Sequence, residues 1–417
     1  MEEIFASEIN VKEAKVVKNL SIPLSDKERK HLLITGKNGR GKTSLLEELD
    51  KYLGSISKSL LQGYQNDINT LNNLKKQLSN LEFTPDKDTN TFQQIVQVRN
   101  KIESLEKCMI NLGNARINFK NEHLLWEKAN SGTFIIAFFD AKRHSNLKRP
   151  SGITKINLQQ RYKSQENANQ HFLQYLVNLK ADRSFARDEN EERIVVSIDK
   201  WFNHFQERLR DIFESPNLEL KFDRKNYTFQ ILEEDKEPYS FNTLSDGYSA
   251  IISIVSELLL RMEAHEAKNY DMEGLVLIDE IETHLHVDLQ KKILPFLIDF
   301  FPKIQFIVST HSPFVLSSVA NSVICDLETH IVTSDLSGYS YDALIESYFN
   351  SDKYSDIVKA KMLEYEKLVL QNKLDGEEKY RLRELEEYFA HVPKYLSNEL
   401  LVKLQEIKLK SLPTKRS

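Results

Sequence analysis

The segment from Gly36 to Thr43, which reads GKNGRGKT, constrains the fold of this chain more than any other part of its sequence. It fits the pattern G-x-x-x-x-G-K-[ST], a loop that leaves a buried strand, enters a helix and cradles phosphate groups. The flanks have the required character, because His31 to Thr35 is a short apolar run and residues 44–53 carry apolar side chains at helical spacing. The sequence therefore predicts an α/β fold built around a phosphate site.

The residue types in this loop match the chemistry of a bound triphosphate. Small residues let backbone N–H groups turn toward phosphate oxygens, and the new helix adds its positive N-terminal end. Lys42 would reach the β and γ phosphates, and the Thr43 hydroxyl would ligate Mg²⁺. The predicted nucleotide-binding residues are Gly36, Asn38, Gly39, Arg40, Gly41, Lys42, Thr43 and Ser44.

A second buried strand is expected from Gly274 to Ile278, and it ends in the carboxylates Asp279 and Glu280. Asp279 is placed to hold Mg²⁺ through water, and Glu280 to orient or deprotonate the attacking water. Neighbouring residues of a strand point to opposite faces, so the two roles should differ unless the strand ends there. Taken alone the segment also fits an edge strand with an acidic turn, but the phosphate loop favours the hydrolytic interpretation.

Two further elements add to this pattern. Ser245, Asp246 and Gly247 precede an apolar helix expected from residue 249, and a helix start rich in small residues suits an anion. One phosphate loop is enough for a triphosphate, so this second helix start suggests contact with the nucleotide of another copy. His311 follows an apolar strand at 304–309, where a neutral imidazole could contact a γ-phosphate and the attacking water.

In this order, the four elements resemble the head of ABC-type ATPases, with its Walker A loop, signature loop, Walker B strand and switch histidine. The long helical insertion between the Walker A loop and the Walker B strand is similar to that of the soluble SMC-like and OLD-like ATPases within this class. The run DEIETHLH from Asp279 to His286 looks like the Walker B and D-loop of the AAA15/AAA21 group within it. Further matches are the run AKR at 141–143 and the run STHSP at 309–313. The resemblance covers residues 1–55 and 131–340 and is greatest to ATPase subunits of prokaryotic Septu-type anti-phage systems, with PARIS-type systems next.

The resemblance implies a head-to-head homodimer with two molecules of ATP between the copies. Ser245, Asp246 and Gly247 of one copy would contact the nucleotide held by the other copy. It also implies Lys42, Glu280 and His311 as catalytic residues, Thr43 and Asp279 as Mg²⁺ ligands, and Glu282, His284 and His286 as D-loop residues at the interface. The pattern H-x-H-x-D at 284–288 also fits a metal cluster, but its place in the D-loop favours the interface.

One position departs from the family pattern. The family has a Q-loop glutamine directly after the strand at 133–139, as a ligand of the metal and water; Asp140, Lys142 and Arg143 stand there instead. Slow turnover, or ATP binding used as a static clamp, would follow from this change.

The rest of the chain sets the expected organisation. We expect an α/β head with a mixed sheet, formed by residues 1–55 and 131–340, a helical hairpin at 56–130 and a helical tail at 341–417 for oligomer or partner contacts. The net charge is −5 and the two cysteines lie far apart, which fits a cytoplasmic protein without a disulfide framework. The N-terminus lacks the features of a signal peptide, and no apolar run is long enough to span a membrane.

The expected function is that of an ATP-binding and hydrolysing subunit of an anti-phage complex, an oligomeric sensor and scaffold that controls a separately encoded nuclease or toxin of HNH or TOPRIM type. Two alternatives remain open: an SMC-like DNA-repair ATPase, and a nucleotide-locked scaffold with little turnover. The run DKD at 86–88 resembles a TOPRIM element, but no α/β pattern surrounds it. Candidate nucleic-acid contacts are Lys142, Arg143, Lys148 and Arg149, although such basic runs are usually solvated faces.

Overall fold

The computed structural model describes residues 3–57, 64–82, 89–110, 114–143, 146–265, 271–339, 344, 356–371, 373–390, 402 and 404–407. They belong to two compact units, residues 1–339 and residues 340–417, which are considered separately. The second unit begins one residue before the tail that the sequence suggested.

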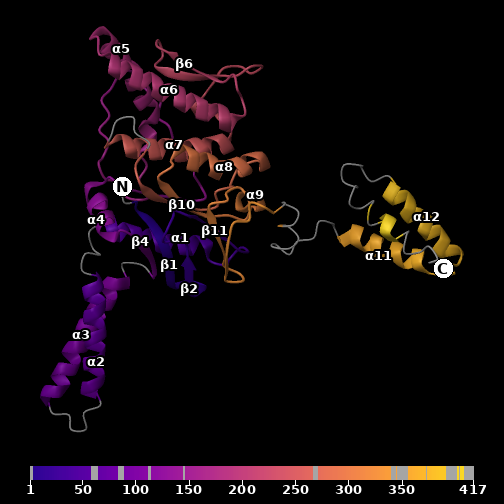
Figure 1. The fold of residues 1–417 in the computed structure, drawn as a ribbon, viewed down its shortest axis with the longest axis horizontal. Helices are drawn as coiled ribbons and strands as arrows, with labels where there is room; N and C mark the ends of the chain where they lie inside the picture. Colours follow the sequence, from indigo (N-terminus) through magenta and orange to yellow (C-terminus); the bar gives the residue numbers. More distant parts are fainter. Residues whose placement is uncertain are drawn as a thin grey trace. The chain divides into compact units, whose positions relative to one another are not determined.

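A six-stranded sheet lies at the centre of the first unit (Figure 1). Its order is β12-β11-β3-β10-β9-β5, and every neighbouring pair is parallel except β11 and β12. The strands are β3 (His31–Thr35), β5 (Ile135–Phe139), β9 (Gly274–Ile278), β10 (Ile304–Ser309), β11 (Ser322–Asp326) and β12 (Ile331–Ser334). Four of them, β3, β9, β10 and β11, are buried at every residue, which is typical of parallel strands covered on both faces. The expected α/β fold with a mixed sheet is confirmed.

A smaller antiparallel sheet covers the phosphate-loop helix. Its order is β2-β1-β4, formed by β1 (Phe5–Ala14), β2 (Val17–Pro23) and β4 (Ala115–Lys120). Helix α1 (Lys42–Ser57) contacts strands of both sheets. Side chains of α1, of the two sheets and of α4 (Glu122–Ser131) form one apolar core. The start of α1 is therefore fixed from two sides.

A helical lobe follows β5 in the chain. It contains α5 (Phe172–Asp188), α6 (Glu192–Phe213), α7 (Asp246–Glu263) and α8 (Val287–Phe300), with a small sheet of β6 (Glu219–Asp223), β7 (Thr228–Leu232) and β8 (Tyr239–Ser240). Short 3-10 helices at Asn169–His171 and Phe241–Thr243 join them. Edge-on aromatic contacts, such as Phe172 with Phe205 at 5.7 Å between ring centroids, fill the lobe.

The helical hairpin is shorter than the segment 56–130 suggested by the sequence. Its two helices are α2 (Tyr64–Glu82) and α3 (Thr89–Ile110), which bury Leu71, Val98 and Ile102 between them. Ile117 falls inside the range 56–130 that was expected to be helical, but it is not part of a helix. It lies in β4, where alternate side chains are buried and the strand pairs with β1. The residues beyond the hairpin thus belong to the head.

The second unit contains α11 (Asp356–Leu370) and α12 (Gly376–Ala390). Tyr365, Leu385 and Phe389 are buried in its apolar core. Arg381 clamps Glu364 through two hydrogen bonds of 2.8 and 2.9 Å. Across both units, none of the described helices is long and apolar enough to cross a membrane.

Candidate functional site

The phosphate loop connects β3 to α1 and depends on its glycines. Gly36, Gly39 and Gly41 have φ angles of 129°, 81° and 90°, a region that other residues rarely adopt. A side-chain carbon at Gly41 would lie 2.9 Å from Cγ2 of Val16 on the neighbouring turn. The loop is therefore a tight cradle that only glycine allows, which fits the expected phosphate-binding role.

Lys42 and Thr43 open helix α1 at the edge of the central sheet. The Lys42 side chain is buried, and its Nζ donates a 2.8 Å hydrogen bond to the carbonyl oxygen of Gly36. Burial lowers the pKa of Lys42, whereas the carboxylates of Glu280, Asp279 and Glu282 raise it. The lysine and the acidic turn after β9 therefore face the same space.

Asp279 accepts hydrogen bonds from two hydroxyl groups. Thr43 Oγ1 donates to its Oδ2 at 2.8 Å, and Ser309 Oγ donates to its Oδ1 at 2.5 Å. A hydroxyl and a carboxylate beside a phosphate loop are the oxygen donors that Mg²⁺ prefers, so these residues fit the expected ion. When bound, Mg²⁺ would supply positive charge to a triphosphate.

Glu280 is the second residue after β9 and has a left-handed conformation, with φ of 44°. Its amide donates to Ser309 Oγ at 2.8 Å, and its carboxylate accepts a longer bond of 3.4 Å from Thr283 Oγ1. Because β9 ends at Ile278, the alternation of a strand no longer applies to Asp279 and Glu280. The backbone turns there, and both residues lie at one site.

Ser309 is a functional candidate that the sequence analysis did not assign. Parallel pairing places Val308 of β10 opposite Ile278 of β9, so the next residues, Ser309 and Asp279, meet at the end of the strands. The sequence shows a mostly apolar run at 304–308 that ends in a serine, which is typical of a strand ending at a site. Only the strand order shows that the acidic turn after β9 lies beside this serine.

Glu282 and His311 are linked across the same edge. The backbone N–H of His311 donates to Glu282 Oε1 at 2.5 Å. Burial, followed by the positive charge of Lys42, lowers the pKa of His311, so its imidazole is neutral at pH 7. Its Nε2 is buried without a hydrogen-bond partner among the described residues. Glu282 thus makes a contact within the chain, and its role at a dimer interface stays a prediction.

Arg143 is not a surface contact for nucleic acid, and that prediction is wrong. Its side chain is 6% exposed. Nη1 donates to the carbonyl oxygens of Asp279 at 2.7 Å and Asp140 at 3.0 Å, and Nη2 donates to that of Glu280 at 2.8 Å. Burial lowers the pKa of Arg143 to about 10, so the side chain remains charged at neutral pH. Buried in this way, the guanidinium is not available to the sugar–phosphate backbone of a nucleic acid.

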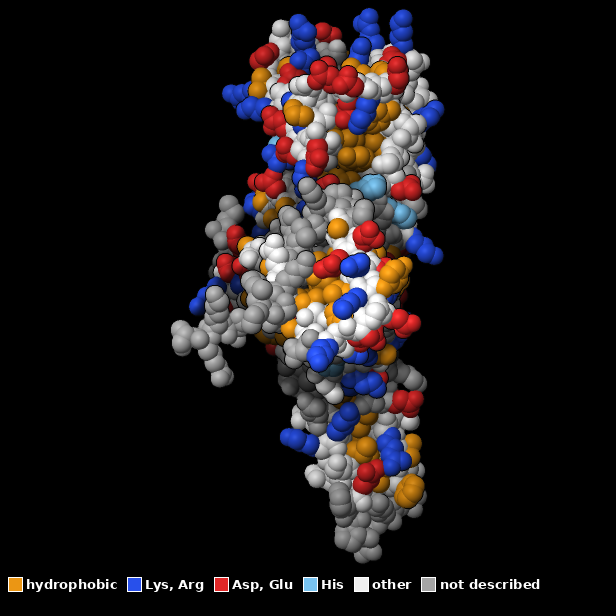
Figure 2. All heavy atoms as spheres, turned by 90° about the vertical axis from the view of Figure 1, so that its right-hand side faces the viewer, with side chains coloured by type: hydrophobic (Ala, Val, Ile, Leu, Met, Phe, Trp, Pro, Cys, Tyr) orange, Lys and Arg blue, Asp and Glu red, His pale blue; other side chains and the backbone are white. Residues whose placement is uncertain are grey.

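The other three candidate nucleic-acid contacts, Lys142, Lys148 and Arg149, are exposed and stay predictions. On the face of the molecule drawn in Figure 2, basic and acidic side chains are interspersed over the helical lobe, with no large area of one sign. This face therefore adds no support to nucleic-acid binding.

The signature loop lines a pocket of about 420 Å³ together with the D-loop. Ser245 is the N-cap of α7, which begins at Asp246 and not at residue 249, and its hydroxyl makes no capping hydrogen bond. A side-chain carbon at Gly247 would lie 2.9 Å from the carbonyl oxygen of His284. The residues that line the pocket are Glu214, Ser245, Asp246, Gly247, Tyr248, His284, His286, Asp288 and Leu289. This set includes no residue of the phosphate loop.

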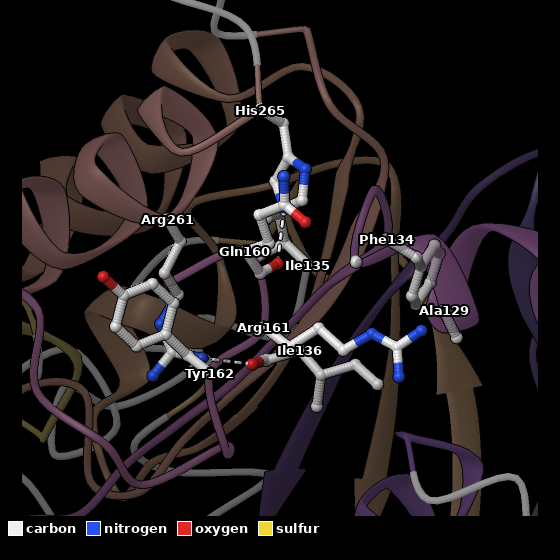
Figure 3. Close-up of a pocket in the computed structure, with 10 residues that line it drawn as sticks. Ala129, Phe134, Ile135, Ile136, Gln160, Arg161, Tyr162, Arg261 and His265 are labelled. Carbon is white, nitrogen blue, oxygen red and sulfur yellow. Dashed lines mark hydrogen bonds between the residues drawn. The ribbon is translucent and has the colours of Figure 1, made fainter. Parts of the chain in front are cut away.

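A buried arginine ties the signature helix to β5 (Figure 3). Arg261 of α7 pairs with Glu257 at 2.7 Å and donates to the carbonyl oxygens of Ile136 in β5, at 2.5 Å, and of Glu166, at 2.6 Å. The Tyr162 ring lies beside the guanidinium, 5.3 Å away. Arg261 therefore links α7 to the strand that precedes Arg143.

Two sequence patterns also suggested other sites: the TOPRIM-like run at 86–88 and the metal-binding pattern at 284–288. The run 86–88 lies outside the described residues. In the parts of the chain that the structure describes, no three histidine, cysteine or acidic side chains converge on a point that could hold a metal ion.

A family model matches residues 32–317, which span the phosphate loop, the signature loop, the acidic turn and His311. Its description is "AAA domain, putative AbiEii toxin, Type IV TA system". The chain belongs to this family. The AAA resemblance that the sequence motifs indicated is thereby confirmed.

Curated relatives carry the names of two kinds of system. A Septu protein PtuA from Bacillus mycoides is 31% identical over 36% of this chain and 22% of its own length. A Retron Vc95 probable ATPase from Vibrio cholerae is 25% identical over 73% of this chain and 70% of its own length. A second Septu protein PtuA, from Bacillus thuringiensis, is 26% identical over 69% of this chain and 67% of its own length. The resemblance to Septu ATPases is confirmed, while the first match spans under a quarter of that relative.

Among solved structures, an SMC head domain from Thermotoga maritima aligns with 77% of this chain and 94% of that chain. The sequence identity is 11% and the TM-score is 0.35.

Proposed function

We propose that this chain is the ATP-binding and hydrolysing subunit of an anti-phage defence complex, in which it acts as an oligomeric sensor and scaffold. The main support is the convergence of Lys42, Thr43, Asp279, Glu280 and His311 at the carboxyl edge of three adjacent strands. The similarity of the chain to Septu and retron proteins supports the role in defence. We propose that the complex acts in the cytoplasm.

In this proposal the side chains divide the work of hydrolysis. Lys42 and the phosphate-loop amides would hold the phosphates, and Thr43 and Asp279 would hold Mg²⁺. Glu280 would orient or deprotonate the attacking water. Neutral His311 would contact the γ-phosphate through its Nε2, which has no hydrogen-bond partner among the described residues. Such a site acts mainly by positioning and by stabilising charge.

A second copy is needed to complete the site. The lining of the signature pocket includes no phosphate-loop residue. It does include the hydroxyl of Ser245, which makes no capping hydrogen bond at the start of α7, and the backbone packed closely around Gly247. A head-to-head homodimer would bring this pocket of one copy to the nucleotide of the other. ATP binding would then control assembly, and hydrolysis would release it.

The effector is proposed to be a separately encoded nuclease or toxin of HNH or TOPRIM type, held or licensed by the ATPase oligomer. The test is co-expression of the chain with the product of the neighbouring open reading frame, followed by tandem purification and phage challenge. A stable complex that loses protection in the Lys42→Ala variant supports the proposal. An unrelated neighbour without any complex would overturn the effector part.

ATP turnover tests the enzymatic part. Phosphate release is measured for the purified chain and for its Lys42→Ala and Glu280→Gln variants, together with binding of a fluorescent ATP analogue. We expect Lys42→Ala to lose binding and Glu280→Gln to bind but not hydrolyse. Wild-type release no faster than that of Glu280→Gln would favour the nucleotide-locked scaffold. ATP-dependent, salt-sensitive DNA binding by the chain alone would favour the SMC-like repair ATPase instead.

A further inference from the structure

Arg143 lies at the catalytic edge of the central sheet, and the division of work proposed for hydrolysis gives it no role. It follows β5, the strand next to β9, and its guanidinium reaches the two residues after β9. The three carbonyl oxygens that it contacts belong to Asp140, Asp279 and Glu280. One rigid, planar group therefore ties the ends of two neighbouring strands together.

The Glu280 peptide needs such support. Its φ of 44° is costly for a residue with a side chain, roughly 1–2 kcal/mol. Its amide is fixed by Ser309 Oγ, and its carbonyl oxygen accepts from Arg143 Nη2 at 2.8 Å and from the Thr283 amide at 2.9 Å. The carboxylate, by contrast, has only the 3.4 Å contact with Thr283 Oγ1 among the residues that the structure describes. The fold therefore holds the Glu280 backbone in place through several hydrogen bonds and leaves its carboxylate loosely held.

Electrostatics favour an arginine at this point. Four carboxylates raise the pKa of Arg143 against the effect of burial: Glu282, Asp140, Asp279 and Glu280. A permanent positive charge behind the acidic turn offsets part of their mutual repulsion. Two nitrogens of the planar arginine fork reach three carbonyl groups here, whereas lysine would have to serve them from a single nitrogen at the end of a flexible stem.

We propose that Arg143 is a positioning residue for hydrolysis, holding the Asp279–Glu280 backbone so that the Glu280 carboxylate faces the attacking water. The inference rests on the proposed ATPase function. Arg143 does not contact ATP in this view; it acts through Glu280. Its loss should lower kcat and leave nucleotide affinity nearly unchanged.

The test compares Arg143→Gln and Arg143→Lys with Arg187→Gln, which removes an exposed arginine of α5 and controls for the loss of one positive charge. We expect kcat to fall about a hundredfold in Arg143→Gln and less in Arg143→Lys, because a catalytic group misplaced by an ångström costs on the order of a hundredfold. KM and the Kd for the fluorescent ATP analogue should stay within about twofold, and Arg187→Gln should match the wild type.

A double-mutant cycle distinguishes positioning from general damage. If Arg143 acts through Glu280, the variant carrying both Arg143→Gln and Glu280→Gln hydrolyses ATP no more slowly than Glu280→Gln alone. Additive losses, or an Arg143→Gln variant with wild-type kcat, would overturn the proposal. Should Arg143→Gln fail to fold, Arg143→Lys carries the same comparison.

Hydrogen exchange across residues 279–285 separates this inference from the proposed function. Faster exchange in Arg143→Gln, confined to that segment, supports the positioning role even if the wild type proves not to hydrolyse ATP, which would remove the proposed function alone. Unchanged exchange there would overturn the role of Arg143, whatever the activity of the wild type.

Discussion

Single hydroxyl groups matter at this site because each bridges two parts of it. Ser309 Oγ donates to Asp279 and accepts from the Glu280 amide. We expect Ser309→Ala to lose about 1–3 kcal/mol of stability, since the remaining buried groups lose a partner, and to lower kcat about tenfold or more. Steady-state kinetics and urea unfolding measure the two effects.

Ser322 is the matched control, because it is equally buried and, within the described part of the chain, its hydroxyl bonds only the Val319 carbonyl, at 2.8 Å. Ser322→Ala should lose stability but keep kcat. Equal effects of both substitutions on kcat would show that Ser309 acts only through stability.

The glycines of the phosphate loop permit a second prediction. Gly41→Ala would place a carbon 2.9 Å from Val16 in a backbone with φ of 90°, so we expect ATP affinity to fall at least about tenfold because of strain in the loop. Gly54 lies in helix α1, where an added side-chain carbon would meet nothing within 4 Å, so Gly54→Ala is the control. It should keep ATP affinity and raise stability by up to about 1 kcal/mol. Titration with a fluorescent ATP analogue decides between the two outcomes.

At the scale of elements, the pairing of β3 and β10 contains a buried histidine that makes the fold sensitive to acid. His31 Nδ1 accepts a 3.1 Å hydrogen bond from the Phe306 amide, and burial, followed by the charge of Arg29, lowers the pKa of His31 to about 4. The folded chain therefore keeps this imidazole neutral. Its contribution is complete above the unfolded pKa of 6.5 and declines as the pH falls toward 4.

We expect the wild type to lose up to about 3 kcal/mol from this group between pH 7 and pH 4, at about 1.4 kcal/mol for each pKa unit. His31→Asn keeps an acceptor but cannot be protonated in this range, so it should lose less on acidification. Urea unfolding of both proteins at several pH values gives the difference. Parallel pH curves for the two proteins would contradict the expectation.

The sequence predicted the elements that have strong local patterns. The phosphate loop, the acidic turn after β9 and the helix pair α2–α3 all follow from glycine spacing, apolar runs or helical periodicity. It failed at Ile117, since one apolar residue fits a helical stripe and a strand equally well, and only pairing with β1 decides. It also misjudged Arg143, because a basic run near a strand end does not reveal which side chain turns inward.

Whole-molecule organisation depends on whether the nucleotide site is shared between copies. A head-to-head dimer predicts that two inactive variants complement each other when mixed. Lys42→Ala destroys the phosphate loop of its own copy, and Ser245→Arg should block only the nucleotide of the other copy. In a mixed dimer, one of the two sites then combines an intact loop with an intact signature pocket.

Random mixing of equal amounts should therefore restore about a quarter of wild-type hydrolysis, because about half of the dimers are mixed and one site in each is intact. Each variant alone should be nearly inactive, while Ser245→Arg still binds the ATP analogue. Phosphate release after mixing and sedimentation of each sample with ATP provide the measurements. Activity that never exceeds the mean of the separate variants would place both sets of residues at one site within a single copy, and the signature pocket would then need another ligand.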